Sequence, residues 1–372
     1  MSSFDITATR KCFPSLDKKQ VYLDNAGGSQ TLGTVIDSIY DYLINSNVQL
    51  GGSYNVGKKA NTSYSAGYEA AAKYINAPHL ILNFRNLSQA FDFPPDSELI
   101  ISSIDHESNI ASWVALAASQ KFTIKWWTPP ASSNPILTPE SLRPLLSSKT
   151  ALVTLTHASN ILGTIHDIRG ISDVVHTIPG ALLCVDGVAY SPHRPLDVQA
   201  LGVDFYAFSW YKVYGPHISL LYASPSALSS LKSLGHFFNP SNTLADKLAL
   251  AGSNYELTGS IPRVVEYFET QSWEAISLHE ETLQKTLLQY LLSRSEIRFL
   301  ANNLGIRKRE FVRSASSYKG LEVENSWKSN RLCKDVLGCG DQGVVRVSFV
   351  HYNSLEEVNR LIGIFDEILG KA

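Results

Sequence analysis

Four polar residues of types that carry chemistry lie just after short apolar runs. In chain order they are His106, Asn160, Asp186 and Lys212. In open α/β sheets, ligands bind at the carboxyl ends of the strands, which is where this placement would put them. A lysine among bulky aromatic residues is suited to Schiff-base chemistry when burial lowers its pKa. On spacing alone, Lys212 would more commonly be an exposed loop lysine and His106 a structural histidine. Four polar clusters at the ends of successive strands nevertheless favour a functional site.

The elements that must position these residues are typical of an α/β sheet. Continuous apolar runs, expected for strands covered on both faces, lie at 98–104, 122–127, 151–157, 181–187, 204–209 and 218–224. Thr138-Pro139-Glu140 predicts a helix N-terminus, and Ser354 with Glu357 predicts a capping box that opens a last helix. Alternation of strands and helices predicts a sheet that is at least partly parallel.

The composition bounds the class of protein. The chain has 372 residues, 44% hydrophobic and 18% charged, which predicts a folded protein of about two domains. A net charge of −2 favours neither a nucleic-acid nor a membrane partner. The apolar runs are too short to span a membrane, the N-terminus lacks the apolar segment of a secretory signal, and four scattered cysteines make no disulfide framework. We expect a soluble, cytoplasmic protein of enzyme size.

The run Asp105-His106-Glu107 contains three residue types that bind metals. Neighbouring residues of an extended strand point to opposite faces, which disfavours joint ligation. We therefore expect no metal site.

Six motifs occur in an order that resembles one family. They lie at 21–28 (VYLDNAGG), 105–109 (DHESN), 159–163 (SNILG), 185–187 (VDG), 209–216 (SWYKVYGP) and 346–353 (RVSFVHYN). This set is similar to the class V aminotransferase family of pyridoxal-phosphate enzymes, and to its cysteine desulfurase-like branch in particular. The resemblance implies a fold-type I architecture. A large domain over 20–250 would hold a mostly parallel seven-stranded sheet, 1–19 and 251–372 would form a small α/β domain, and two chains would form a homodimer.

The resemblance also implies roles for the residues at the strand ends. Lys212 would hold pyridoxal 5'-phosphate as a Schiff base and move the substrate α-proton. Asp186 would pair with the pyridinium nitrogen, which keeps the ring an electron sink. His106 would stack on the ring, and Asn160 would bind its phenolic oxygen.

Three further residues complete the implied site. Ser209 would contact the phosphate, and Tyr211 would stand at the cofactor where desulfurases commonly have a histidine. Arg346 would bind the α-carboxylate of the substrate through its bidentate fork. For Asp24 and Asn25, a role in shaping the N-terminal turn is the better interpretation.

The implied function is a pyridoxal-phosphate enzyme acting on a small amino acid. The favoured reaction is carbon–sulfur cleavage of the β-elimination type, and the alternative is transamination or epimerisation. Cys333, 13 positions before Arg346 (346 − 333), is the candidate sulfur acceptor, and Cys339 lies closer to that arginine. The sequence around Cys333 does not match the family's loop motif. A structural role for this cysteine is therefore as good an interpretation as a role as sulfur acceptor.

The chain departs from the family pattern after Ala77. The family has a strand there, then a Gly/Ser/Thr-rich turn that cradles the phosphate. Neither is evident between 77 and 87, and 300–330 lacks an expected apolar strand. A second hypothesis is therefore a diverged member with weakened or lost cofactor binding.

Overall fold

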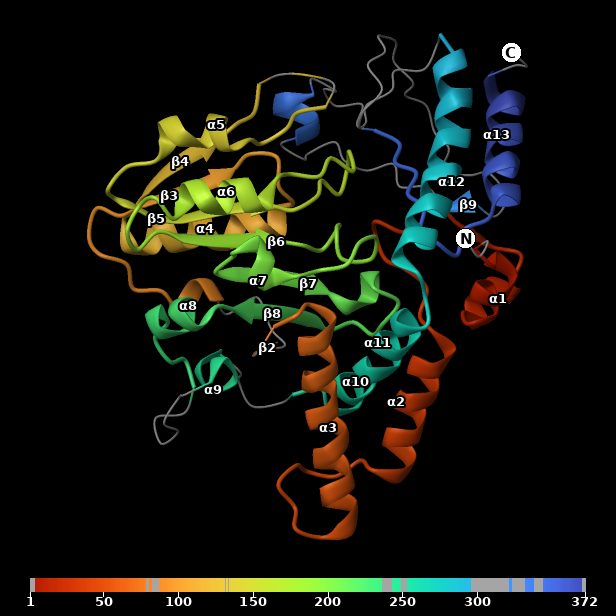
Figure 1. Ribbon diagram of the computed structural model, residues 1–372, viewed down its shortest axis with the longest axis horizontal. Helices are drawn as coiled ribbons and strands as arrows, with labels where there is room; N and C mark the ends of the chain where they lie inside the picture. The colour runs from red at the N-terminus through yellow and green to blue at the C-terminus, as the bar shows by residue number, and fades with distance from the viewer. Residues whose placement is uncertain are drawn as a thin grey trace.

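A computed structural model describes residues 4–77, 80–81, 87–130, 132, 134–235, 243–248, 253–295, 321–322, 332–337 and 344–369 (Figure 1). The strands are β1 (Val21–Tyr22), β2 (Leu80–Ile81), β3 (Glu98–Ser102), β4 (Thr123–Trp127), β5 (Thr150–Thr156), β6 (Leu182–Asp186), β7 (Phe205–Ser209), β8 (Ser219–Ala223) and β9 (Leu321–Glu322). The α-helices are α1 (Ile6–Lys11), α2 (Gly33–Asn45), α3 (Asn55–Tyr74), α4 (Glu107–Gln120), α5 (Pro139–Leu142), α6 (Ile168–Val175), α7 (Val198–Leu201), α8 (Pro225–Ser230), α9 (Leu244–Leu248), α10 (Tyr255–Gly259), α11 (Ile261–Glu269), α12 (Trp273–Ser293) and α13 (Leu355–Leu369). Short 3-10 turns include η4 (Trp210–Lys212), and a π-helical turn covers Leu332–Val336.

Seven strands form one sheet in the order β2-β8-β7-β6-β5-β3-β4. All neighbours from β7 to β4 are parallel, whereas β8 runs antiparallel to β7 and β2 runs antiparallel to β8. The predicted mostly parallel seven-stranded sheet is confirmed, and the six predicted strands are β3 to β8. Parallel strands place their carboxyl ends at one edge of the sheet, so the residues that follow them meet there.

Strand β2 corrects one expectation from the sequence. A strand does stand between α3 and β3, because Leu80 and Ile81 pair with Tyr222 and Leu221 of β8. Two residues are too short a run for an apolar pattern to reveal, and the pairing itself defines the strand. The predicted loss of the phosphate turn falls largely on 82–86, outside the described residues. Within 300–330 the structure describes only β9, which pairs in parallel with β1.

Helices cover both faces of the sheet, as the continuous apolar runs predict. Leu152 of β5 packs in one hydrophobic cluster with Trp113 of α4. Its neighbour Val153 packs in the other cluster, with Val174 of α6. Because successive strand residues point to opposite faces, each strand stabilises both layers through apolar burial.

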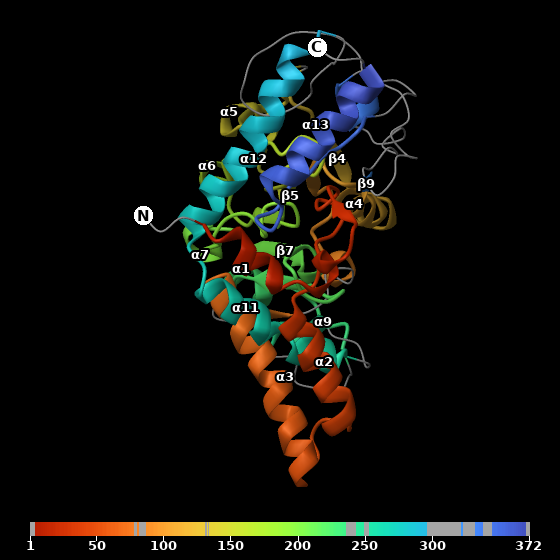
Figure 2. The same cartoon turned by 90° about the vertical axis from the view of Figure 1, so that its right-hand side faces the viewer.

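The two ends of the chain pack together beside the sheet (Figures 1 and 2). Val21 and Leu23 share a hydrophobic cluster with Leu283 of α12 and with Val358 and Leu361 of α13. The predicted capping box of α13 is present: the Glu357 amide donates to Ser354 Oγ at 3.2 Å, and the Ser354 amide donates to Glu357 Oε2 at 3.1 Å. Within the described ranges, no helix combines the length and the apolarity needed to cross a membrane.

Candidate active site

Asp186 is the last residue of β6, and backbone pairing fixes its place. It pairs in register with Thr156 of β5 on one side and with Ala207 of β7 on the other. Its carbonyl oxygen accepts from the His157 amide at 2.7 Å, and its carboxylate Oδ1 accepts from the Val188 amide at 2.9 Å. The residue is 8% exposed, and burial raises the pKa of its carboxyl group. The sheet therefore holds the Asp186 carboxylate buried at its carboxyl edge.

Lys212 ends the 3-10 turn η4, which directly follows β7. Its side chain is buried, and burial lowers the pKa of the Lys212 amine to about 8. The charge of Asp186 opposes that shift, and the charge of Arg346 adds to it. Part of the amine is thus neutral and nucleophilic near physiological pH, which a solvated lysine is not. The exposed loop lysine is excluded for this position.

Arg346 lies 5% exposed in the segment before α13, against the N-terminal segment. Its Nε lies 3.0 Å and its Nη2 2.5 Å from Oδ1 of Asp24. Its Nη1 donates to the carbonyl oxygen of Asn160 at 2.8 Å. Asp24 thus orients the guanidinium, and the structure gives Asp24 more than the turn-shaping role that the sequence suggested.

The other predicted site residues lie around this edge of the sheet. His106 is the N-cap of α4 and is exposed, with Nδ1 accepting from the Ser108 amide at 3.2 Å. Partial desolvation lowers the pKa of His106, and the charge of Asp186 opposes this. Asn160 and Ser209 are half-buried. The Tyr211 ring stacks on His217, with centroids 4.9 Å apart, and Lys212 Nζ lies 5.9 Å from the Tyr211 centroid.

Three polar groups at this edge fit a ligand such as pyridoxal phosphate. Asp186 Oδ2, the Asn160 side-chain amide and the Lys212 amine make no hydrogen bond with any residue that the structure describes. A buried carboxylate is stabilised by a cationic hydrogen-bond donor, which a protonated ring nitrogen supplies. The Lys212 amine matches the aldehyde of pyridoxal phosphate, and the Asp186 oxygen matches its pyridinium nitrogen. The Asn160 amide matches its phenolic oxygen.

Sequence reasoning missed one acidic residue next to this site. Asp105 is 2% exposed; its Oδ1 accepts from the Thr156 amide at 3.0 Å and its Oδ2 from Asn109 Nδ2 at 2.7 Å. Burial, with a smaller contribution from the charge of Asp186, raises the pKa of Asp105 to about 7. Asp105 directly follows the strand predicted at 98–104, and this position was the signal in the sequence that could have marked it as a site residue. Asp105 is buried and His106 is exposed, but they do not alternate along a strand, because β3 ends at Ser102 and α4 begins at Glu107. No metal-binding cluster occurs among the described residues.

Cys333 lies in the π-helical turn Leu332–Val336 with 0% of its surface exposed. A sulfur acceptor needs an accessible thiolate. Its assignment as the acceptor stays a prediction, one that requires this turn to open. Cys339 lies outside the described residues.

Comparisons with known proteins define the class. A family model described as Aminotransferase class-V matches residues 21–361, so the chain belongs to that family. It is 49% identical to the aminotransferase-like protein FGM3 of Gibberella zeae, over 99% of both chains. It is 37% identical to the cysteine desulfurase-like protein ustD of Aspergillus flavus, over 98% of this chain and 91% of that one. The solved cysteine desulfurase CsdA of Escherichia coli superposes with a TM-score of 0.82 at 21% identity, over 99% of both chains, which confirms the predicted fold.

Proposed function

We propose that the chain is a pyridoxal-phosphate enzyme acting on a small amino acid by cysteine desulfurase-like chemistry, with carbon–sulfur cleavage of the β-elimination type. The observation that carries this is the buried Lys212 amine, whose pKa responds to both Asp186 and Arg346. One site then holds a nucleophilic amine, a carboxylate and a guanidinium. Membership of the class V aminotransferase family supports the same reading.

The proposed chemistry divides between the cofactor and the chain. When bound, pyridoxal phosphate supplies an electron sink for charge that develops at the substrate α-carbon. Asp186 would accept the ring N–H and keep that nitrogen protonated, and Asn160 and His106 would orient the ring. Ser209 and Tyr211 would contact the cofactor from the end of β7. Arg346 would bind the substrate carboxylate, and Lys212 Nζ would take up and return the α-proton.

The route of the sulfur favours elimination over persulfide transfer. Transfer to Cys333 requires contact with the substrate sulfur, whereas that thiol is fully buried. With cysteine as substrate, elimination breaks the Cβ–S bond, and the products after hydrolysis are pyruvate, ammonia and sulfide. Persulfide transfer yields alanine in place of pyruvate. Transamination yields a keto acid with sulfur retained, and epimerisation changes only chirality.

Product analysis with the purified, cofactor-loaded chain and cysteine tests this proposal. Pyruvate and sulfide in equal amounts support elimination, and alanine contradicts it. The variant Cys333→Ala should release sulfide at the wild-type rate; loss of release would make Cys333 the acceptor. A wild-type chain that binds no pyridoxal phosphate contradicts the function as a whole.

A homodimer and a cytoplasmic location are further proposals. Ile36, Tyr40, Leu43 and Ile44 repeat at helical spacing on α2 and are 47%, 69%, 48% and 65% exposed. Figure 2 shows α2 and α3 projecting from the body of the molecule. A second copy of the chain would cover this apolar face. Light scattering of the wild type and of Ile44→Glu tests this, with dissociation expected for the variant.

A further inference from the structure

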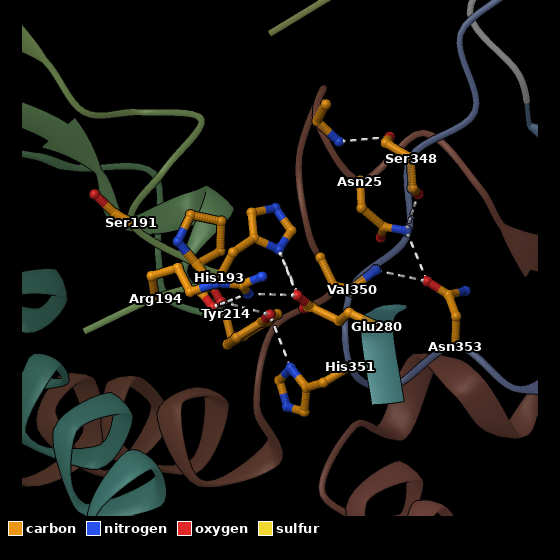
Figure 3. Close-up of polar contacts among 12 residues, drawn as sticks. Asn25, Ser191, His193, Arg194, Tyr214, Glu280, Ser348, Val350, His351 and Asn353 are labelled. Carbon is orange, nitrogen blue, oxygen red and sulfur yellow. Dashed lines mark hydrogen bonds and ion pairs between the residues drawn. The ribbon is translucent and has the colours of Figure 1, made fainter. Parts of the chain in front are cut away.

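A fully buried histidine, His351, links the segment of Arg346 to the turn of Lys212. Its Nδ1 lies 2.9 Å from the Tyr214 hydroxyl oxygen, a contact that Figure 3 shows. Its Nε2 lies 2.6 Å from the hydroxyl oxygen of Tyr267 in α11. His351 has 0% of its surface exposed, so its ring nitrogens need protein partners, and these hydroxyls provide them.

The direction of these hydrogen bonds follows from the network. Burial lowers the pKa of His351 to about 3, so its ring is neutral and has one donor and one acceptor. The Tyr214 hydroxyl also lies 3.5 Å from the Pro192 carbonyl oxygen, which only accepts. We therefore assign the proton to Nδ1, which donates to Tyr214, while Tyr267 donates to Nε2.

Tyr214 lies two residues after Lys212 in a backbone conformation that needs support. Its φ is +61°, in the left-handed region that favours glycine. Its amide donates to Ser29 Oγ at 3.0 Å, and its carbonyl oxygen accepts from the Leu32 amide at 3.0 Å. A residue keeps such a conformation only where several contacts hold it. Among the described residues, the bond to His351 is the side-chain hydrogen bond that ties Tyr214 to the C-terminal segment.

The C-terminal end of this link is also fixed. The Val350 amide donates to Asn353 Oδ1 at 3.0 Å, and Asn25 Nδ2 donates to the Ser348 carbonyl oxygen at 2.8 Å (Figure 3). Arg346 lies five positions before His351 in this segment (351 − 346). His351 and Arg346 therefore belong to one short stretch whose backbone is anchored between them.

We propose that His351 is a positioning residue of the active site, whose hydrogen bond to Tyr214 holds the Lys212 turn and the Arg346 segment in one arrangement. The inference rests on the proposed function for the roles of Lys212 and Arg346. It goes beyond that function by assigning a residue that contacts neither the substrate nor the cofactor. Catalysis depends on such placement, because small displacements of reacting groups reduce rates strongly.

Four variants separate this role from simple packing. Tyr214→Phe and His351→Leu delete the proposed bond, while His351→Asn places an amide donor close to the position of Nδ1. Tyr267→Phe is the matched control, because it deletes a hydroxyl on the same histidine but not the link to Lys212. Circular dichroism confirms that each variant folds.

The readout is the pH at which the Lys212 amine becomes reactive. Acetic anhydride labelling of the full-length chain without added cofactor, followed by mass spectrometry of the Lys212 peptide, gives this midpoint. We expect Tyr214→Phe and His351→Leu to raise the midpoint towards that of an exposed lysine. In the loaded enzyme, both should lower kcat/KM about tenfold. His351→Asn should bring both the labelling midpoint and kcat/KM most of the way back to the wild-type values. Tyr267→Phe should keep the wild-type midpoint.

Two results would overturn the assignment of His351. One is a Tyr267→Phe midpoint that shifts as far as that of Tyr214→Phe; the other is His351→Asn behaving like His351→Leu. Either would make the contact structural only. A wild-type chain that binds no cofactor contradicts the proposed function instead, and the labelling midpoints still decide whether His351 positions Lys212.

Discussion

The two halves of the candidate site are built in different ways. Asp186 ends β6 and Lys212 lies in the turn after the adjacent strand β7; Thr156 Oγ1, only 30 positions from Asp186, donates to the Asp186 carbonyl oxygen. Arg346 is held by Asp24, 322 positions away, through side-chain contacts. Backbone pairing within a seven-stranded sheet places the first half. A few hydrogen bonds between the two ends of the chain place the second.

The two halves should therefore respond differently to substitution. The strand-end half depends on a sheet that is covered on both faces by apolar clusters, so single side-chain changes there should alter chemistry more than structure. The half around Arg346 depends on individual side chains. Changes there should alter substrate affinity and local stability together.

Removing the amine at the strand end should have the largest effect. Lys212→Ala should lower turnover about a thousandfold, because it deletes the proposed nucleophile and proton carrier. Lys285→Ala, at a lysine with 65% side-chain exposure, is the matched control and should keep wild-type turnover. Turnover assays of both check this. Equal turnover of Lys212→Ala and wild type would remove the strand-end half from the site.

The buried carboxylate comes next. Asp186→Asn should lower kcat about a hundredfold, since a neutral amide no longer stabilises a charged ring nitrogen. The Val188 amide bond to the side-chain oxygen can persist, so the thermal unfolding midpoint should change little. A large fall in that midpoint with kcat unchanged would show a structural carboxylate instead.

The ion pair of the remote half predicts a stability effect. Asp24→Asn leaves the buried Arg346 without its carboxylate and should lower the free energy of unfolding by about 2 kcal/mol. KM should fall at the same time, because Asp24 no longer competes with a substrate carboxylate. Urea denaturation and steady-state kinetics measure the two. A rise in KM would mean that orienting Arg346 matters more than releasing it.

Arg346→Lys should raise KM about tenfold, which corresponds to ~1.4 kcal/mol of binding. A lysine keeps the charge but loses the planar fork that reaches a carboxylate and the Asn160 carbonyl together. The effect on kcat should be smaller. An unchanged KM would argue against carboxylate binding by this residue.

The smallest expected effect is a pH dependence of stability. The pKa of Lys212 is about 8 when folded and ordinary when unfolded, so the unfolded chain holds more protons above pH 8. Stability without cofactor should therefore rise with pH, by about 1 kcal/mol between pH 7 and 9. The measure is the difference in urea denaturation between wild type and Lys212→Met, which lacks this dependence. No difference in slope would place the amine in solvent.

Local signals in the sequence pointed to the strand-end residues but not to their roles. Apolar runs located the strands, and the polar residues after them were Asp186, Lys212, His106 and Asn160, yet on spacing alone an exposed lysine and a structural histidine were the more common outcomes. The proposed roles of these four, like that of Arg346, came from the family resemblance. Nothing local connects positions 24 and 346. The pairing of Arg346 with Asp24 could not be predicted, because it depends on how the two chain ends pack.

Two other misses have the same physical origin. Strand β2 is defined by pairing with β8 over two residues, and no pattern of that length is readable. The bonds of His351 to Tyr214 and Tyr267 join segments 137 and 84 positions away. Such contacts depend on tertiary packing, which sequence periodicity does not encode.

Lys212 in the strand-end half is proposed to hold the cofactor as a Schiff base. Borohydride reduction of the chain loaded with pyridoxal phosphate, followed by peptide mass spectrometry, detects that bond. We expect one cofactor-derived mass per chain, on the peptide that contains Lys212, and none in Lys212→Ala. A label on another lysine, or no label at all, would contradict it.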